Sequence, residues 1–90
     1  MTVTTVPAWV RRAEADVISL PQKRTPGMQA RVADAYHRLA TWSLICTWAS
    51  DDTDAIKDAF RDHIEFCQRA TEWAERAEHE PAPTRRRRRQ

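Results

Sequence analysis

The stretch Trp42-Ser43-Leu44-Ile45-Cys46-Thr47-Trp48 decides how this chain must fold. At 100° per residue in an α-helix, its apolar side chains point in every direction, so a single partner helix cannot cover them all. Leu44 and Trp48 face the side opposite Trp42 and Cys46, with Ile45 between the two sides. A helix segment of this kind is either enclosed by its own chain or leaves part of its surface for a partner.

The composition around this stretch is that of an all-α protein. The 90 residues include a single Gly and many Ala, whereas folds rich in β-turns need Gly. One small domain is the most that this length allows. Arg greatly outnumbers Lys, which is typical of GC-rich genomes such as those of actinobacteria and their phages.

Hydrophobic spacing and end signals predict three helices. The first begins after Pro7, where the missing N–H of proline costs nothing, and ends before Pro21. Residues 21–27 contain two Pro and the single Gly, so they are expected to form a loop. The second helix covers about 27–49 and the third about 53–79, where apolar residues occupy half of the circumference.

The segment Ser50-Asp51-Asp52-Thr53-Asp54 joins the second helix to the third. Hydroxyl and carboxylate side chains of this kind cap helix N-termini. The alternative, a calcium-binding loop, needs the Gly and the closing Glu of an EF-hand, and both are missing. A turn this tight makes the two long helices an antiparallel hairpin, with position 46 opposite about 57 and position 67 opposite about 36.

We therefore expect an all-α fold in which a short N-terminal helix packs on a long antiparallel helical hairpin, giving a three-helix bundle that dimerises. Residues 1–7 are expected to form a flexible arm, residues 8–80 the single three-helix domain, and residues 81–90 a disordered tail rich in Pro and Arg. Trp42 and Cys46 continue the apolar seam of the second helix, so that side should face the third helix.

The short first helix cannot cover the whole hairpin. At 1.5 Å per residue it is about 20 Å long, so it should reach only to about residue 40 and cover the 70–77 end of the third helix. Leu44, Ile45 and Trp48 would then face water, and such a patch marks an association site. The predicted interface, for self-association or for another protein, comprises Trp42, Leu44, Ile45, Trp48, Phe60, Phe66 and Trp73. The alternative is that the arm folds over this patch.

The two cysteines and His63 are the candidates for a disulfide or a metal site. In the hairpin register given above, Cys46 and Cys67 are about ten helical residues apart, or ~15 Å, which is too far for a bridge. Both are therefore expected to be free thiols. His63 and Cys67 are one turn apart and offer two zinc ligands, but only a dimer would supply the others. We predict no metal site and no cofactor, and interpret His63 as a hydrogen-bonded histidine of the interface.

The charges are unevenly distributed along the chain. Residues 51–80 carry ten acidic and four basic side chains, whereas the last ten residues carry five Arg and no acid. A run of Arg binds phosphate backbones without sequence specificity, and it also suits an acidic protein surface. The residues of this second candidate contact are Arg85, Arg86, Arg87, Arg88 and Arg89.

We predict a small non-enzymatic interaction protein (a regulator, inhibitor or adaptor) that acts through its apolar helix face as a homodimer. No paired catalytic carboxylates, Gly-rich phosphate loop or nucleophile–base pattern indicates an enzyme or a small-molecule substrate. One alternative is a nucleic-acid-binding accessory protein that uses the Arg tail, and another is a structural subunit of an assembly such as a phage particle. Without a signal peptide pattern or a membrane-length apolar run, we expect a cytoplasmic location and no membrane contact.

Overall fold

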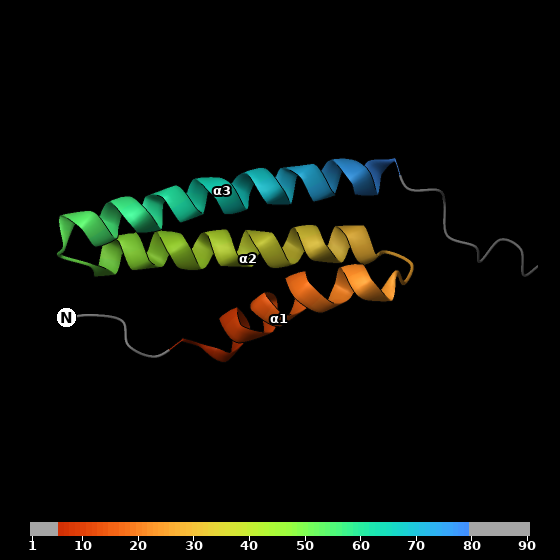
Figure 1. Ribbon diagram of the computed structural model, residues 1–90, viewed down its shortest axis with the longest axis horizontal. Coiled ribbons are helices and arrows are strands. Elements are labelled where there is room, and N and C mark those ends of the chain that lie inside the picture. The colour runs from red at the N-terminus through yellow and green to blue at the C-terminus, as the bar shows by residue number, and fades with distance from the viewer. Residues whose placement is uncertain (1–5, 80–90) are drawn as a thin grey trace, which may run out of the picture.

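The computed structural model describes residues 6–79, which form three α-helices and no strand. Helix α1 (Ala8–Lys23) is followed by α2 (Met28–Ala49) and α3 (Thr53–Glu78). Figure 1 shows α2 and α3 running antiparallel along the length of the molecule, with α1 packed obliquely on another side of α2. The predicted all-α class, with a short helix on a long helical hairpin, is confirmed. Most of the expected arm and the whole of the expected tail lie outside the described residues.

Helix α1 begins as predicted and ends later than predicted. The carbonyl oxygen of Pro7 accepts hydrogen bonds from the N–H groups of Val10 and Arg11, both at 3.1 Å. Pro21 lies inside the helix and does not end it. Its fixed φ is compatible with a helix, and its missing N–H removes one helical hydrogen bond, the one that would reach the Val17 carbonyl. The end comes at Arg24, whose left-handed conformation (φ 52°) lets its N–H bond to the Leu20 carbonyl.

Local signals place the starts of α2 and α3. Gly27 precedes α2 with a φ of 76°, a backbone conformation that glycine adopts without strain. At the start of α3, the Asp52 carboxylate accepts a hydrogen bond of 3.0 Å from the N–H of Asp54. The predicted helix cap in the segment 50–54 is therefore confirmed.

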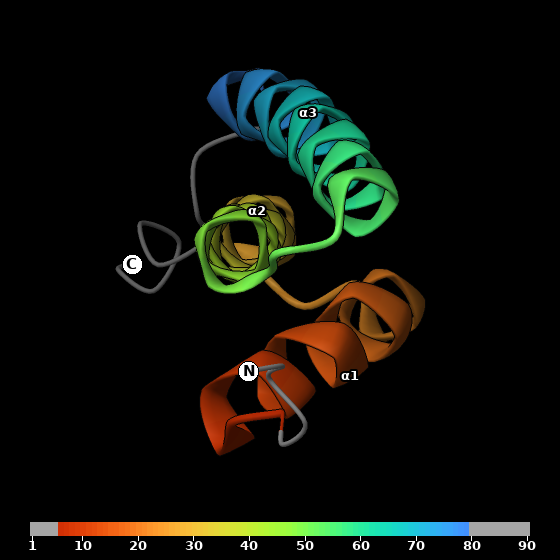
Figure 2. The same ribbon diagram turned by 90° about the vertical axis from the view of Figure 1, so that its left-hand side faces the viewer.

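Helix α2 is central among the described helices, because α1 and α3 both pack on it. No Cα atom of α1 lies within 8 Å of a Cα atom of α3. Ala35 and Leu39 belong to the core that α2 shares with α1. Tyr36 and Ala40, which directly follow Ala35 and Leu39 in the sequence, contact α3 instead. The ring of Tyr36 packs on Phe66, and the Ala40 carbonyl oxygen accepts a hydrogen bond from the His63 side chain. A step of one residue turns a side chain by 100° around the helix axis, so α1 and α3 lie on different sides of α2. Viewed from the end, the three helices form an angle with α2 at its corner, not a closed triangle (Figure 2).

The expected approach of α1 to the 70–77 end of α3 is therefore not seen in the backbone, since the Cα atoms of the two helices stay more than 8 Å apart. In contrast, α1 reaches further along α2 than expected, since Trp9 packs edge-to-face on Trp42 with ring centroids 6.2 Å apart. The longer helix and the size of the Trp9 side chain account for this extra reach. Trp42 consequently packs against α1, and the expectation that its side of α2 would face α3 is wrong.

The register of the hairpin agrees with the one predicted from its turn. Position 36 was expected opposite about 67, and the rings of Tyr36 and Phe66 lie 6.2 Å apart. Four residues along α2, the carbonyl oxygen of Ala40 accepts a hydrogen bond of 2.8 Å from Nδ1 of His63. The two contacts give the same pairing to within one residue, so the tight turn at 50–52 fixes how α2 and α3 align.

The buried core is built mainly from small side chains, which let the helices approach closely. Val10 and Val32 are the largest side chains that are fully buried, and Ala70 is the buried residue of α3. The larger aromatic side chains lie at the rim of this core, half-buried or exposed. The remaining buried residues are Ala13, Leu20, Ala33, Ala35, Leu39, Ala40 and Ser43.

We expect Leu39→Ala to lower the free energy of unfolding by about 2–5 kcal/mol, because the lost methyl groups leave a cavity where α1 meets α2. Leu39 is only 5% exposed and belongs to the core cluster. The control Ile18→Ala, at a side chain that is 67% exposed on α1, should change that free energy by less than about 0.5 kcal/mol. Urea unfolding followed by far-UV circular dichroism measures both, and equal losses would contradict the assigned core.

Candidate functional site

Large apolar side chains remain exposed along one edge of the hairpin. Trp48, in the last turn of α2, is 75% exposed, and Phe60 and Ile64, on successive turns of α3, are 51% and 45% exposed. Leu44 is half-buried one turn before Trp48. We call the surface formed by these four residues the apolar flank.

The hydrogen bond between His63 and Ala40 explains why residues from two helices share this flank. On α2, Leu44 and Trp48 follow Ala40 at intervals of four residues, so they continue along the same side of the helix. On α3, Phe60 lies one turn before His63, and its ring stacks on the imidazole with centroids 6.2 Å apart. The two stripes therefore run beside each other, on the side of the hairpin that faces away from α1.

The structure divides the residues of the predicted interface into three groups. Leu44, Trp48 and Phe60 lie on the apolar flank, together with Ile64, which was not among the predicted interface residues. Ile45 is half-buried on the back of α2, next to the half-buried Trp42. Phe66 and Trp73 lie on the opposite edge of α3, toward α1.

The opposite edge of α3 is covered by local contacts. Phe66 packs against the core shared by α1 and α2 and against the ring of Tyr36. The guanidinium of Arg76 lies over the ring of Trp73, 4.5 Å from its centroid, in a cation–π contact. This contact occupies Arg76, which the i,i+4 spacing would otherwise pair with Glu72. Glu72 lies 3.9 Å from Arg69 instead.

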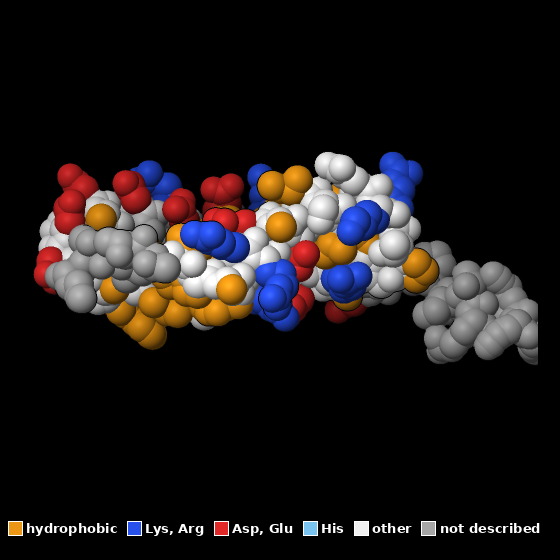
Figure 3. Space-filling view, turned by 90° about the horizontal axis from the view of Figure 1, so that it is seen from below, with side chains coloured by type: hydrophobic (Ala, Val, Ile, Leu, Met, Phe, Trp, Pro, Cys, Tyr) orange, Lys and Arg blue, Asp and Glu red, His pale blue; other side chains and the backbone are white. Residues whose placement is uncertain are grey.

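Figure 3 shows the side of the molecule on which α1 lies. Hydrophobic side chains gather toward the end where α1 begins and α2 meets α3, while Lys and Arg are spread over the middle and the other end. The basic residues between α1 and α2 stand among acids, as in the depression lined by Arg12, Asp16, Arg31, Asp34 and Arg38. Arg38 is paired with Asp34 at 3.0 Å. The described surface therefore has mixed charge here, without the continuous basic stripe of a phosphate-binding face.

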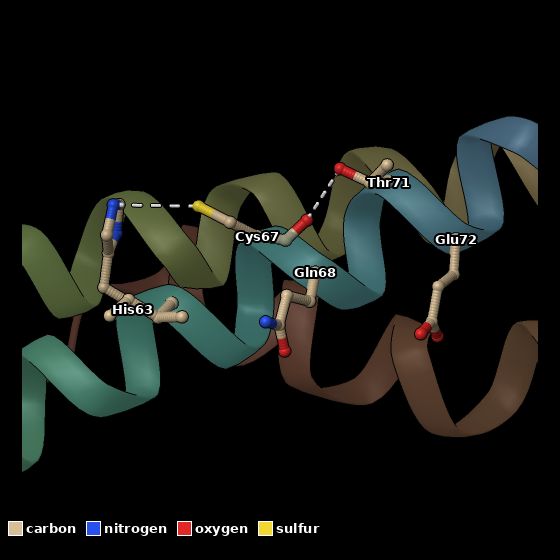
Figure 4. A pocket seen from close by; sticks show the side chains of 6 residues that line it. His63, Cys67, Gln68, Thr71 and Glu72 are labelled. Atoms are coloured by element: carbon tan, nitrogen blue, oxygen red, sulfur yellow. Dashed lines mark hydrogen bonds between the residues drawn. The ribbon is translucent and has the colours of Figure 1, made fainter.

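A shallow groove runs along α3 beside the apolar flank. It is lined by His63, Ile64, Cys67, Gln68, Thr71 and Glu72, all from the same helix. In Figure 4 the His63 ring and the Cys67 thiol point toward each other along one edge of the helix, while Gln68 and Glu72 extend away from them. The groove thus contains one pair of chemically reactive side chains.

Hydrogen bonds fix the orientation and tautomer of His63. A carbonyl oxygen only accepts, so the 2.8 Å contact with Ala40 places the hydrogen on Nδ1. Nε2 of the neutral ring is then an acceptor, and the Cys67 thiol lies 3.6 Å from it. His63 is hydrogen-bonded as expected, but its carbonyl partner belongs to the same chain.

Both cysteines are free thiols, as predicted. Burial raises the pKa of the Cys46 thiol above its ordinary value. Among the described residues, no group of three or more His, Cys, Asp or Glu side chains converges in a way that could hold a metal ion. Within residues 6–79 of one chain, a metal ion would therefore find at most two such ligands in one place.

The known proteins give no independent indication of function: no family model, curated protein or solved structure matches this chain. None of the helices in residues 6–79 combines the length and apolarity needed to cross a membrane. The second candidate contact, Arg85 to Arg89, lies outside the described residues.

We expect the Cys46 thiol to react with iodoacetamide more slowly in the folded Cys67→Ser variant than in the same variant unfolded in guanidinium. Its raised pKa leaves less thiolate at a given pH, and the thiolate is the nucleophile. The rate should therefore rise toward its plateau at higher pH in the folded protein than in the unfolded one. Mass spectrometry of quenched time points measures the rates. Coinciding pH profiles would contradict the burial of this thiol.

Proposed function

We propose that this protein is a small non-enzymatic interaction module that self-associates as a homodimer through the apolar flank. The observation that carries the proposal is the exposure of Trp48 beside Phe60 and Ile64 on adjacent helices. Aromatic residues of this kind are enriched at the centres of protein interfaces. A regulator, inhibitor or adaptor role follows from a surface suited to binding another protein chain.

Burial of this flank would favour association. Covering Trp48, Phe60 and Ile64 removes roughly 350 Å² of apolar surface per chain from water, or about 9 kcal/mol per chain at ~25 cal/mol per Å². Each of the two chains contributes this amount. The association itself costs on the order of 4–15 kcal/mol in lost translational and rotational freedom, and ordering the interface side chains costs more. The apolar burial is therefore of the same order as these costs.

A second copy of the chain is the simplest partner for this surface. The flank is part of an antiparallel helical hairpin, and two hairpins packed about a two-fold axis form a four-helix arrangement in which each flank covers the other. The small core within one chain supports the same proposal. A domain in which half of the buried residues are Ala and the aromatic side chains stay at the rim gains stability when the rim is covered.

We expect Trp48→Ala to weaken the dimer about 30-fold or more, because removing a Trp that is buried in an interface costs about 2 kcal/mol or more. Ile64→Ser should also weaken it, through the same flank. Sedimentation velocity over a range of concentrations measures the dissociation constants. Unfolding in urea should show that both variants remain folded.

The matched control is Ile18→Ser, which alters an equally apolar and more exposed side chain on α1, outside the flank. It should leave the dissociation constant unchanged. A wild-type protein that stays monomeric at all concentrations, or an Ile18→Ser variant as weak as Ile64→Ser, would refute the proposed interface.

A further inference from the structure

His63 and Cys67 present two soft metal ligands at the spacing that zinc requires. With bonds of about 2.0 Å to nitrogen and about 2.3 Å to sulfur, tetrahedral zinc holds its N and S ligands about 3.5 Å apart. Nε2 of His63 and Sγ of Cys67 are separated by 3.6 Å. The two atoms also point toward each other from one edge of α3 (Figure 4). The separation of the two atoms is therefore that of two ligands of one zinc ion, and a small rotation of either side chain would turn both toward it.

The orienting contact of a zinc-binding histidine is already in place. Histidines that bind zinc through one ring nitrogen donate the other N–H to a carbonyl or carboxylate, which fixes the ring. Nδ1 of His63 donates to the Ala40 carbonyl at 2.8 Å, leaving Nε2 to face the thiol. Phe60 stacks on the same imidazole and further restricts it. A histidine that served packing alone would not need its free nitrogen aimed at a cysteine.

We propose that His63 and Cys67 form half of a zinc site, and that the same two residues of a second copy complete it as a Cys₂His₂ site. The proposal rests on the self-association proposed above, because the described residues of one chain provide only this pair. It departs from the sequence-based prediction, which assigned no metal to the pair because only a dimer would supply the other ligands.

The position of the pair matches such a shared site. The shared site requires that the two-fold axis of the dimer pass beside Cys67, which lies on the same edge of α3 as Phe60 and Ile64 of the apolar flank. Each Cys67 thiol releases its proton to solvent as its sulfur binds the metal. Two thiolates then balance the two positive charges of Zn²⁺, so the completed site adds no net charge to an apolar interface.

Cobalt(II), which absorbs visible light strongly in tetrahedral thiolate sites, is the probe for this inference. The full chain, treated with a chelator and kept reduced with a phosphine, is titrated with cobalt(II). We expect tetrahedral ligand-field bands and thiolate-to-cobalt charge transfer that saturate at one metal per two chains. Zinc should then displace the cobalt and abolish these bands.

Matched variants locate the ligands. Cys67→Ser and His63→Gln should each lose the tetrahedral spectrum, whereas Cys46→Ser and His37→Gln should retain it. Far-UV circular dichroism shows whether each variant is folded. Absence of the spectrum in the wild type, its survival in Cys67→Ser, or saturation at one metal per chain would overturn the site.

Sedimentation velocity of the same samples separates this inference from the proposed function. Dimers that form in chelator and depend on Trp48, but give no cobalt spectrum, would refute the zinc site and leave the interface standing. If both hold, zinc should lower the dissociation constant of the wild type at least tenfold, and this effect should disappear in Cys67→Ser. A wild-type dissociation constant that is the same with and without zinc would overturn the shared site.

Discussion

Helix α2 must bury two of its sides at once, because α1 and α3 both pack on it while their own Cα atoms stay more than 8 Å apart. Two rows of α2 side chains, one residue apart in the sequence, contact the two neighbouring helices. Ala35 and Leu39 face α1, and Tyr36 and Ala40 face α3. The resulting angle keeps the cross-section open (Figure 2). The edge of the hairpin that faces away from α1 consequently has no covering helix, and the apolar flank lies there.

The size distribution of the core follows from the same constraint. A helix that touches neighbours on two sides packs closely only where its contacting side chains are small, and half of the buried residues are Ala. Large aromatic side chains are thereby placed at the rim. Those near α1 have ring partners within the chain, as with Trp9 on Trp42 and Phe66 on Tyr36. Those on the other edge, Trp48 and Phe60, are left for a partner in the proposed function.

Much of the fold was predictable, because local signals with short-range causes determine it. Pro7, Gly27 and Asp52 mark helix starts through φ preferences and N-terminal hydrogen bonds, and the tight turn sets the hairpin register. Pro21 misled the prediction, since a proline does not always end a helix and only the surrounding structure decides whether the helix continues. The candidate site was less predictable. Phe60 and Phe66 have equivalent hydrophobicity, and their different exposure depends on which edge of α3 the first helix approaches.

The sequence by itself determined the three helices, their antiparallel pairing and the excess of apolar surface on residues 42–48, because these follow from periodicity, capping and chain connectivity. Only the tertiary structure decided where that excess remains exposed and which polar atoms meet. Helix α1 packs on the side of α2 that carries Trp42, so Trp42 contacts Trp9 while Trp48 remains exposed to solvent. The packing of α3 on α2 brought Nδ1 of His63 to a carbonyl 23 residues away and turned its other nitrogen toward Cys67. Contacts of this range depend on helix crossing angles, which residue spacing alone does not specify.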